Sequence, residues 1–302
     1  MKRQRHHYIP RFYLESWAHS EGKVFEYSLG RKNEIRVRLV TPKRTGFVWD
    51  LYKIEVLAGD YAYDVEKKFM GMVDSRAAIV FQKILSSQMW GLSSEERVEF
   101  ANLIFSLVIR NPQELGLFKK QFSRDWDKKI PDIEERYKAT LWRPGYPDSF
   151  SEYEKIVAPD YWKVAVYEVF CNLIQDENFS RLLSSMHWGV RELSVRGKQL
   201  LTSDRPVIMT NGLMGESAHV LLPISPDKLF FCSPSARVVE CLYDLSDRLL
   251  LRDLNRKIMR QALSYVYSAR QFDSKVIKKY FAKADYEPFV RRTLGLVQRP
   301  PH

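Results

Sequence analysis

The chain has 302 residues and a formal net charge of +11, from 48 Lys and Arg against 37 Asp and Glu. Its length fits one large domain or two small ones, and 45% hydrophobic residues exclude wholesale disorder. No apolar run approaches the roughly 20 residues of a membrane-spanning helix, and no apolar segment of a secretory signal follows the basic start. The spacing of Cys171, Cys232 and Cys241 fits neither a disulfide framework nor a zinc site. We therefore expect a cytoplasmic protein with reduced thiols and no membrane contact.

The positive charge is concentrated at the two ends of the chain. Residues 1–50 contain 11 basic and 5 acidic side chains, net +6, and residues 251–302 contain 12 and 4, net +8. The residues between them carry a net charge of −3. This pattern predicts that both ends form one basic face for nucleic acid or for an acidic protein partner. The alternative is two solvated basic ends without such a partner.

The first fifty residues predict a short helix and several strands. A helix is expected over 11–18, because Pro10 favours a helix start. Residues 24–28 and 34–40 alternate apolar and polar side chains, which predicts a hairpin. A further short strand is expected at 47–53.

The long middle of the chain is predicted to be helical. Apolar residues recur at steps of three and four over 65–84, which indicates one helix face. Ser93 and Glu96 form a capping-box pattern that opens a helix apolar nearly all round, ending before Pro112. Further helices are expected over 113–140 and within 159–185, separated by a loop at 142–151.

The second half returns to short strands and ends in helices. The strand–helix–strand–helix order predicts an α+β fold with β elements from both ends of the chain around a mainly helical middle, sharing one sheet. Strands are expected at 187–193, 199–203, 206–209, 219–223, 228–233 and 265–268, and helices at 250–263 and 275–283. We expect one domain, 1–302, with a β-rich segment 1–55, a helical segment 60–185, and a segment 186–302 that is β-rich and then basic and helical.

Three stretches carry a family resemblance: His6 to Leu14 (HHYIPRFYL), Leu201 to Ile208 (LTSDRPVI) and Leu221 to Asp227 (LLPISPD). With them the chain resembles an uncharacterised bacterial family, a domain of unknown function. This family opens with His-His-Tyr-x-Pro-x-x-Tyr-Leu and carries Thr-Ser-Asp-x-Pro in its second half. The resemblance spans almost the whole chain and implies a single family domain, but no activity. Arg110-x-Pro112 and Asn255 also match the family pattern, whereas Asp74 stands where the family has Glu.

His6 and His7 are candidate catalytic residues in a basic segment. A neutral imidazole titrates near pH 6.5 and acts as a general base or a metal ligand. Adjacent residues on a regular strand point to opposite sides, so at most one of the two histidines is expected to face a site. The alternative is that His7 packs locally under aromatic neighbours.

Asp204 is a candidate to orient a catalytic histidine or bind a metal, or simply to cap a turn between two strands. Arg205 and Arg11 are expected to bind a substrate phosphate or carboxylate. Ser203 is a weaker nucleophile candidate, because no Gly-x-Ser-x-Gly elbow surrounds it.

Glu66 and Asp74 lie eight residues apart on the predicted helix, about 80° apart around its axis, and are candidate ligands of Mg²⁺ or Mn²⁺. Alternatively, Glu66 pairs with a neighbouring lysine. Arg110 follows an apolar helix and needs a carboxylate partner, either Asp74 or Asp204, and is a catalytic candidate. Asn255 is a substrate-binding or buried hydrogen-bonding candidate.

These residues favour a phosphodiesterase acting on nucleic acid, a nuclease of the toxin or defence-effector type. The first alternative is a nucleic-acid or protein binding module without catalysis, and the second is a hydrolase or transferase of a small metabolite. No organic cofactor is expected, because no nucleotide-binding glycine motif occurs. The tyrosines in basic segments are expected to stack on bases, namely Tyr8, Tyr13, Tyr280 and Tyr286.

Overall fold

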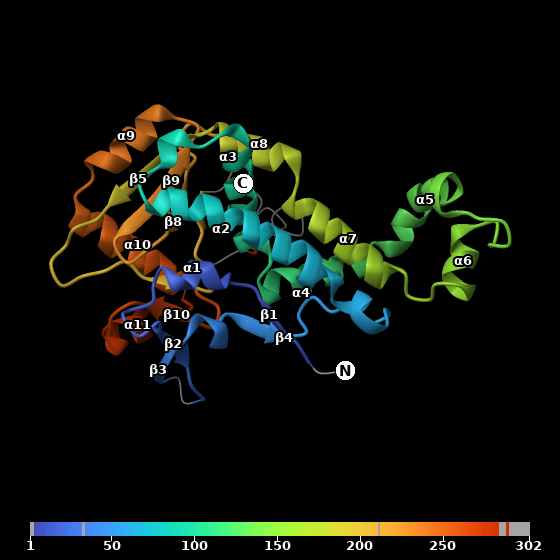
Figure 1. Ribbon diagram of the computed structural model, residues 1–302, viewed down its shortest axis with the longest axis horizontal. Helices are drawn as coiled ribbons and strands as arrows, with labels where there is room; N and C mark the ends of the chain where they lie inside the picture. Colours follow the sequence, from blue (N-terminus) through green and yellow to red (C-terminus); the bar gives the residue numbers. More distant parts are fainter. Residues whose placement is uncertain (1–2, 32–33, 211, 284–287, 290–302) are drawn as a thin grey trace, which may run out of the picture.

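The computed structural model describes residues 3–31, 34–210, 212–283 and 288–289. Its fold is α+β, with strands contributed by both ends of the chain and a helical middle (Figure 1), as the sequence predicts. Among the described residues, no helix is long and apolar enough to cross a bilayer.

One antiparallel sheet joins the two ends of the chain. The predicted hairpin forms as β2 and β3, and β10 pairs with β2 through Val266 opposite Tyr27. On its other side β10 pairs with β6, which places Val266 opposite Ser203. The expectation that strands of the first and last segments share a sheet is therefore confirmed, in the order β3-β2-β10-β6. Its strands are β2 (Val24–Leu29), β3 (Ile35–Val40), β6 (Thr202–Ser203) and β10 (Val266–Ser268).

The described residues form two further antiparallel sheets. The first pairs β1 (Arg5–His7) with β4 (Phe47–Trp49). The strand expected at 47–53 ends early, because Asp50 adopts a left-handed backbone with a φ of 57°. The other sheet has the order β5-β9-β8-β7, from β5 (His187–Glu192), β7 (Ile208–Met209), β8 (Val220–Pro223) and β9 (Lys228–Ser233).

The helical middle is broken more often than the sequence indicates. The predicted capping box is present, because Ser93 accepts from the Glu96 amide while Glu96 accepts from the Ser93 amide. The helix expected within 159–185 divides in two, since Asp176 caps a new helix by accepting from the Phe179 amide. These helices are α2 (Gly71–Leu85), α3 (Ser94–Ile109), α4 (Pro112–Arg124), α5 (Trp126–Arg136), α6 (Phe150–Ile156), α7 (Trp162–Ile174) and α8 (Glu177–Ser185).

Several helices differ from the sequence-based expectation. The helix expected over 113–140 divides at Asp125 into α4 and α5. Helix α6 starts inside the expected loop, capped by the Ser149 hydroxyl. Helices α5 and α6 project from the body as an arm held by α4 and α7 (Figure 1). The other helices are α1 (Arg11–Glu15), α9 (Ala236–Asp244), which was not expected, α10 (Asp247–Gln261) and α11 (Ser274–Tyr280).

A π-helical turn, η3 (Val65–Met70), leads into α2. Such turns are rare and occur frequently at functional sites. Glu66, one of the predicted metal ligands, lies on this turn.

Candidate functional site

The β1 strand separates the two histidines. His6 is fully buried, with its ring stacked on Tyr52 and against the edge of Tyr63. The His6 Nδ1 atom accepts a 2.9 Å hydrogen bond from the Tyr52 amide. His7 is partly exposed and faces a cleft. The expected alternation is thus observed, and it places His6 in the core rather than at the cleft.

The cleft that His7 borders has a volume of about 530 Å³. It lies between the first segment of the chain and the start of α2. Burial, and then the charge of Arg11, lower the pKa of His7 from 6.5 to about 4, against an opposing backbone hydrogen bond with Lys43. The imidazole is therefore neutral at pH 7, as a proton acceptor must be.

Glu66 borders the same cleft from the π-helical turn. Its Oε1 atom accepts from the His7 amide at 3.4 Å. Burial raises the pKa of the Glu66 carboxyl from 4.5 to about 7, against the opposing effects of this hydrogen bond and of Arg110. A carboxyl with this pKa is half protonated at neutral pH, so Glu66 is a candidate general acid. The alternative pairing of Glu66 with a neighbouring lysine is not observed, since the neighbouring Lys67 and Lys68 pair with Asp60 and Asp64.

Arg110, at the end of α3, is fully buried and pairs with Asp74 of α2 at 2.7 Å between Nη1 and Oδ1. Its Nε atom donates to the Tyr8 carbonyl at 2.8 Å, and Tyr52 donates its hydroxyl to the Arg110 carbonyl at 2.7 Å. Of the two carboxylates that the sequence offered as partners, Asp74 is the one observed. Asp74 remains 25% exposed at the cleft, and burial raises its pKa despite the nearby guanidinium.

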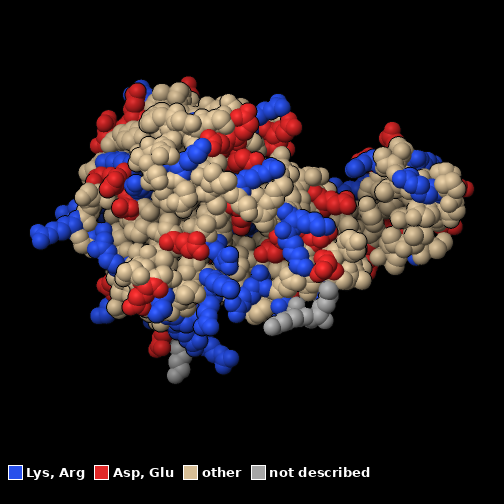
Figure 2. All heavy atoms as spheres, viewed as in Figure 1, with Lys and Arg blue, Asp and Glu red and all other residues tan. Residues whose placement is uncertain are grey.

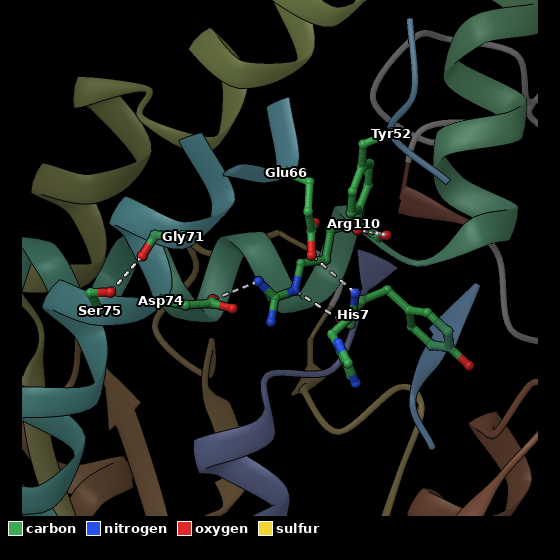
Figure 3. A network of polar contacts seen from close by, with 8 residues as sticks. His7, Tyr52, Glu66, Gly71, Asp74, Ser75 and Arg110 are labelled. Carbon is green, nitrogen blue, oxygen red and sulfur yellow. Dashed lines mark hydrogen bonds and ion pairs between the residues drawn. The ribbon is translucent and has the colours of Figure 1, made fainter. Parts of the chain in front are cut away.

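Several buried polar atoms in this region have no hydrogen-bond partner within the described part of the chain. They are His7 Nε2, Glu66 Oε2 and Arg110 Nη2, together with His6 Nε2 in the adjoining core. His7, Glu66 and Arg110 come from β1, the π-helical turn and the end of α3, and they lie side by side (Figure 3). Buried polar atoms without partners are rare in folded proteins, because each costs about 1–3 kcal/mol. The unpartnered atoms of His7 and Glu66 belong to residues that line the cleft, and Arg110 is joined to the cleft through its ion pair with Asp74, which lines it.

The rim of the cleft is basic. Arg5, Arg11 and Lys43 line it, with Glu15 as an exposed acidic neighbour. Lys and Arg side chains gather over α1, β1 and the β2–β3 hairpin (Figure 2). Arg5 and Lys43 were not singled out from the sequence, where the only signal was the high density of basic residues in the first segment.

The aromatic residues of the β1–β4 ribbon extend this basic rim. The Arg5 guanidinium lies 4.9 Å from the centre of the Phe47 ring and 5.2 Å from that of Trp49, and Trp49 is 41% exposed. The expectation of base stacking is wrong for Tyr8 and Tyr13, because both rings are buried in the core. Tyr280 is partly exposed elsewhere, and Tyr286 lies outside the described residues.

Metal binding at Glu66 and Asp74 remains a prediction. The described residues contain no group of three or more His, Cys, Asp or Glu side chains placed to hold a metal ion. Asp74 is engaged with Arg110, which leaves Glu66 Oε2 and His7 Nε2 as the open atoms.

Asp204 is fully buried, and its two oxygens accept from the amides of three consecutive residues, Leu263, Ser264 and Tyr265, at 2.6–3.2 Å. Burial raises its pKa to about 6. Asp204 does not line the His7 cleft. The structure therefore places it as an anchor between β6 and the segment before β10, which corresponds to the capping interpretation rather than to a composite site with His7.

The two remaining candidates also lie away from the His7 cleft. Arg205 is buried, and its guanidinium contacts the Gln113 side chain and the Gln261 carbonyl. Asn255 is buried and uses its amide to bridge the Leu201 amide and the Gln199 carbonyl, each at 2.8 Å. Asn255 borders a second cleft, between α10 and α11.

Comparison with known proteins gave one match. A family model described as "Protein of unknown function (DUF4238)" matches residues 5–272, which include all the elements of the His7 cleft. No curated protein and no solved structure matches the chain.

Proposed function

The chain belongs to the DUF4238 family of proteins of unknown function, and from the geometry of its His7 cleft we propose that it is a phosphodiesterase that cleaves nucleic acid, RNA in particular. Two observations carry this proposal: His7, Glu66 and Arg110 lie side by side (Figure 3), and each has a buried polar atom without a partner among the described residues, namely His7 Nε2, Glu66 Oε2 and Arg110 Nη2. Unpartnered atoms of residues at a cleft support a role toward a ligand, because buried polar atoms in folded proteins are normally paired.

The two titratable groups of the cleft have pKa values that are shifted apart. His7, with a pKa of about 4, is a neutral base at pH 6, whereas Glu66, with a pKa of about 7, still holds its proton there. Groups whose environments separate their pKa values in this way suit the base and acid roles of one reaction.

With RNA as substrate, this pair suffices for strand cleavage. His7 accepts the proton of the ribose 2′-hydroxyl, whose oxygen attacks phosphorus. The bond from phosphorus to the 5′-oxygen breaks, and Glu66 donates its proton to that oxygen. The products are a 2′,3′-cyclic phosphate and a free 5′-hydroxyl, with His7 left protonated and Glu66 ionised. A divalent cation, if one binds, adds charge stabilisation at the phosphate.

Arginine side chains supply the positive charge that such a reaction needs. Arg110 is fixed by Asp74 and by the Tyr8 carbonyl, so its Nη2 atom, which has no partner among the described residues, is held in place before the substrate arrives. A preorganised donor stabilises the charge that develops on the phosphate oxygens. Arg11 and Lys43 on the rim provide the approach path for a polyanion.

The test is incubation of purified protein with single- and double-stranded RNA and DNA, in Mg²⁺, in Mn²⁺ and in EDTA. We expect cleavage of single-stranded RNA in all three conditions, with 2′,3′-cyclic phosphate ends. A Glu15→Gln variant is the matched control for Glu66→Gln, because Glu15 is a carboxylate of the same cleft that is exposed. Glu15→Gln should cleave like the wild type.

Intact substrates under all conditions would contradict the proposal. If RNA stayed intact but bound to the protein with an affinity that falls steeply with salt, the basic rim would instead serve a binding module. Binding that survives His7→Ala unchanged would favour that alternative further.

A further inference from the structure

A second cleft, bordered by α10 and α11, has a volume of about 540 Å³. It is lined by the buried Asn255 and by residues of the 197–199 and 270–272 loops, and it shares no lining residue with the His7 cleft. This volume is within the range of sites that hold a small organic ligand.

The charge of this cleft is of one sign only. None of its lining residues, among those described, is acidic. Arg252 pairs with its neighbour Asp253 outside the lining, and within the described ranges the other four cations form no ion pair. A concave site lined by one sign of charge concentrates the electrostatic field and attracts an oppositely charged ligand. The five lining cations are Lys198, Arg252, Arg256, Arg270 and Lys279.

The inner wall of the cleft is apolar and aromatic. Met259 is buried, while Phe272, Val276 and Tyr280 are partly exposed. The Arg256 guanidinium and the Lys279 ammonium each lie 5.4 Å from the centre of the Tyr280 ring. A planar group that enters here meets an aromatic ring and a guanidinium plane, both of which stack on nucleobases.

The floor of the cleft is held rigidly by side-chain amides. Asn255 bridges the Leu201 amide and the Gln199 carbonyl. The Gln199 side chain in turn accepts from the Arg270 amide at 3.1 Å and donates to the Arg270 carbonyl at 2.7 Å. The backbone that carries Arg270 is therefore fixed to α10, which sets the place from which this side chain reaches the cleft.

We propose that this second cleft binds a nucleotide that carries two or more phosphates, with the phosphates on the cations and the base against Tyr280. Phosphates suit guanidinium groups in particular, because these offer paired donors in a fixed plane. The proposal concerns a site separate from the His7 cleft and does not depend on cleavage of nucleic acid. The nucleotide is either free in solution or the 5′-phosphorylated end of a strand.

The experiment is calorimetric titration of the full chain with ATP, ADP, AMP, adenosine and inorganic tripolyphosphate. We expect affinity in the order ATP, ADP, AMP, with no binding of adenosine and weaker binding of tripolyphosphate, which lacks the base. Arg256→Ala and Arg270→Ala should each weaken ATP binding by about tenfold, the typical effect of losing one charge-assisted contact. A 5′-triphosphorylated trinucleotide that binds more tightly than ATP, with the same dependence on Arg256, would identify a strand end as the source.

Arg260→Ala is the matched control, because Arg260 is an exposed arginine of the same helix that does not line the cleft. Arg11→Ala in the His7 cleft is the second control. Both should bind ATP like the wild type, and circular dichroism should show that all variants are folded. Absence of ATP binding, binding unchanged in Arg256→Ala and Arg270→Ala, or equal weakening in Arg260→Ala would overturn the proposal.

Discussion

Glu66 is partly buried and Asp204 is fully buried, and burial raises the pKa of both carboxyl groups, to about 7 and about 6. Their hydrogen bonds differ. Asp204 accepts from three backbone amides, through both of its oxygens. Glu66 accepts from the His7 amide through Oε1, and its Oε2 atom has no partner among the described residues.

This difference separates a structural role from a chemical one. A carboxyl whose oxygens are all used by the backbone joins segments of the fold and has little left for a ligand. A carboxyl that is buried at a cleft with one oxygen open costs stability and is available for proton transfer. The raised pKa alone does not distinguish the two.

The largest effect is expected from Glu66→Gln. The amide can still accept from His7 but cannot donate a proton as a carboxylic acid does, so RNA cleavage should fall by about 10²–10⁴-fold. The thermal unfolding midpoint should not fall, because the variant removes a costly buried acid. The measurement is single-turnover cleavage together with a thermal melt. A variant that cleaves like the wild type would assign Glu66 a structural role like that of Asp204.

Asp204→Ala should have the opposite effects, a loss of stability without a loss of activity per folded molecule. Three amides lose their acceptor, so the free energy of unfolding should fall by about 3 kcal/mol or more. The measurement is urea unfolding, with Asp253→Ala on the exposed face of α10 as the control. Activity per folded molecule should be retained. A stable Asp204→Ala protein without activity would contradict the comparison.

The lowered pKa of His6 predicts that the free energy of unfolding depends on pH. Burial lowers its pKa to about 4, below the 6.5 of an ordinary histidine, so the unfolded chain binds the proton more readily between these values. The stabilisation is complete above pH 6.5 and is lost as the pH falls toward 4, by about 1–3 kcal/mol.

The control for this effect is His6→Asn, whose side-chain oxygen can still accept from the Tyr52 amide. The pKa of Glu66 shifts in the opposite direction, so the pH dependence of the wild type alone does not isolate His6. The free energy of unfolding in urea is therefore measured for the wild type and the variant at pH 7 and at pH 4.5, and the two losses are compared. The variant should lose less stability on acidification. Equal losses would show that His6 does not contribute.

The smallest effect is expected from Trp49→Ala on the ribbon beside the cleft. Loss of one stacking ring should raise the KM for single-stranded RNA by about tenfold, with kcat nearly unchanged. Trp90→Ala is the matched control, because Trp90 is 84% exposed and lies in the turn Met89–Gly91 before α3 rather than on the β1–β4 ribbon. An equal change of KM in both variants would show that the ribbon does not contact the substrate.

The sequence predicted the elements whose signals are local. The hairpin of β2 and β3 follows from strict alternation, and the start of α3 follows from the Ser93 capping box. The division of the later helices was missed because Asp125 and Asp176 interrupt patterns that remain apolar on one face. At Asp176 a single capping side chain decides the boundary, whereas the Asp125 side chain makes no cap, and periodicity alone shows neither break.

The site was predicted in part, for a similar reason. The separation of His6 from His7 follows from strand geometry, and a carboxylate partner for Arg110 follows from its place after an apolar helix. Whether Asp74 or Asp204 is that partner depends on how α2 packs on α3, which no local pattern encodes. The expected meeting of His7 with Asp204 is not supported by the cleft, because backbone amides outside the motif occupy Asp204.

The central claim, that His7 and Glu66 act as base and acid in one cleft, is tested most directly by the pH dependence of RNA cleavage in EDTA. Arg5, Arg11 and Arg110 act with burial to lower the pKa of His7, and Asp74 acts with burial to raise that of Glu66. The rate should therefore rise from pH 3 through about 4, as His7 loses its proton, and fall above about 7, as Glu66 ionises. A rate that continues to rise from pH 7 to pH 9, or that does not change between pH 5 and pH 9, would contradict the account.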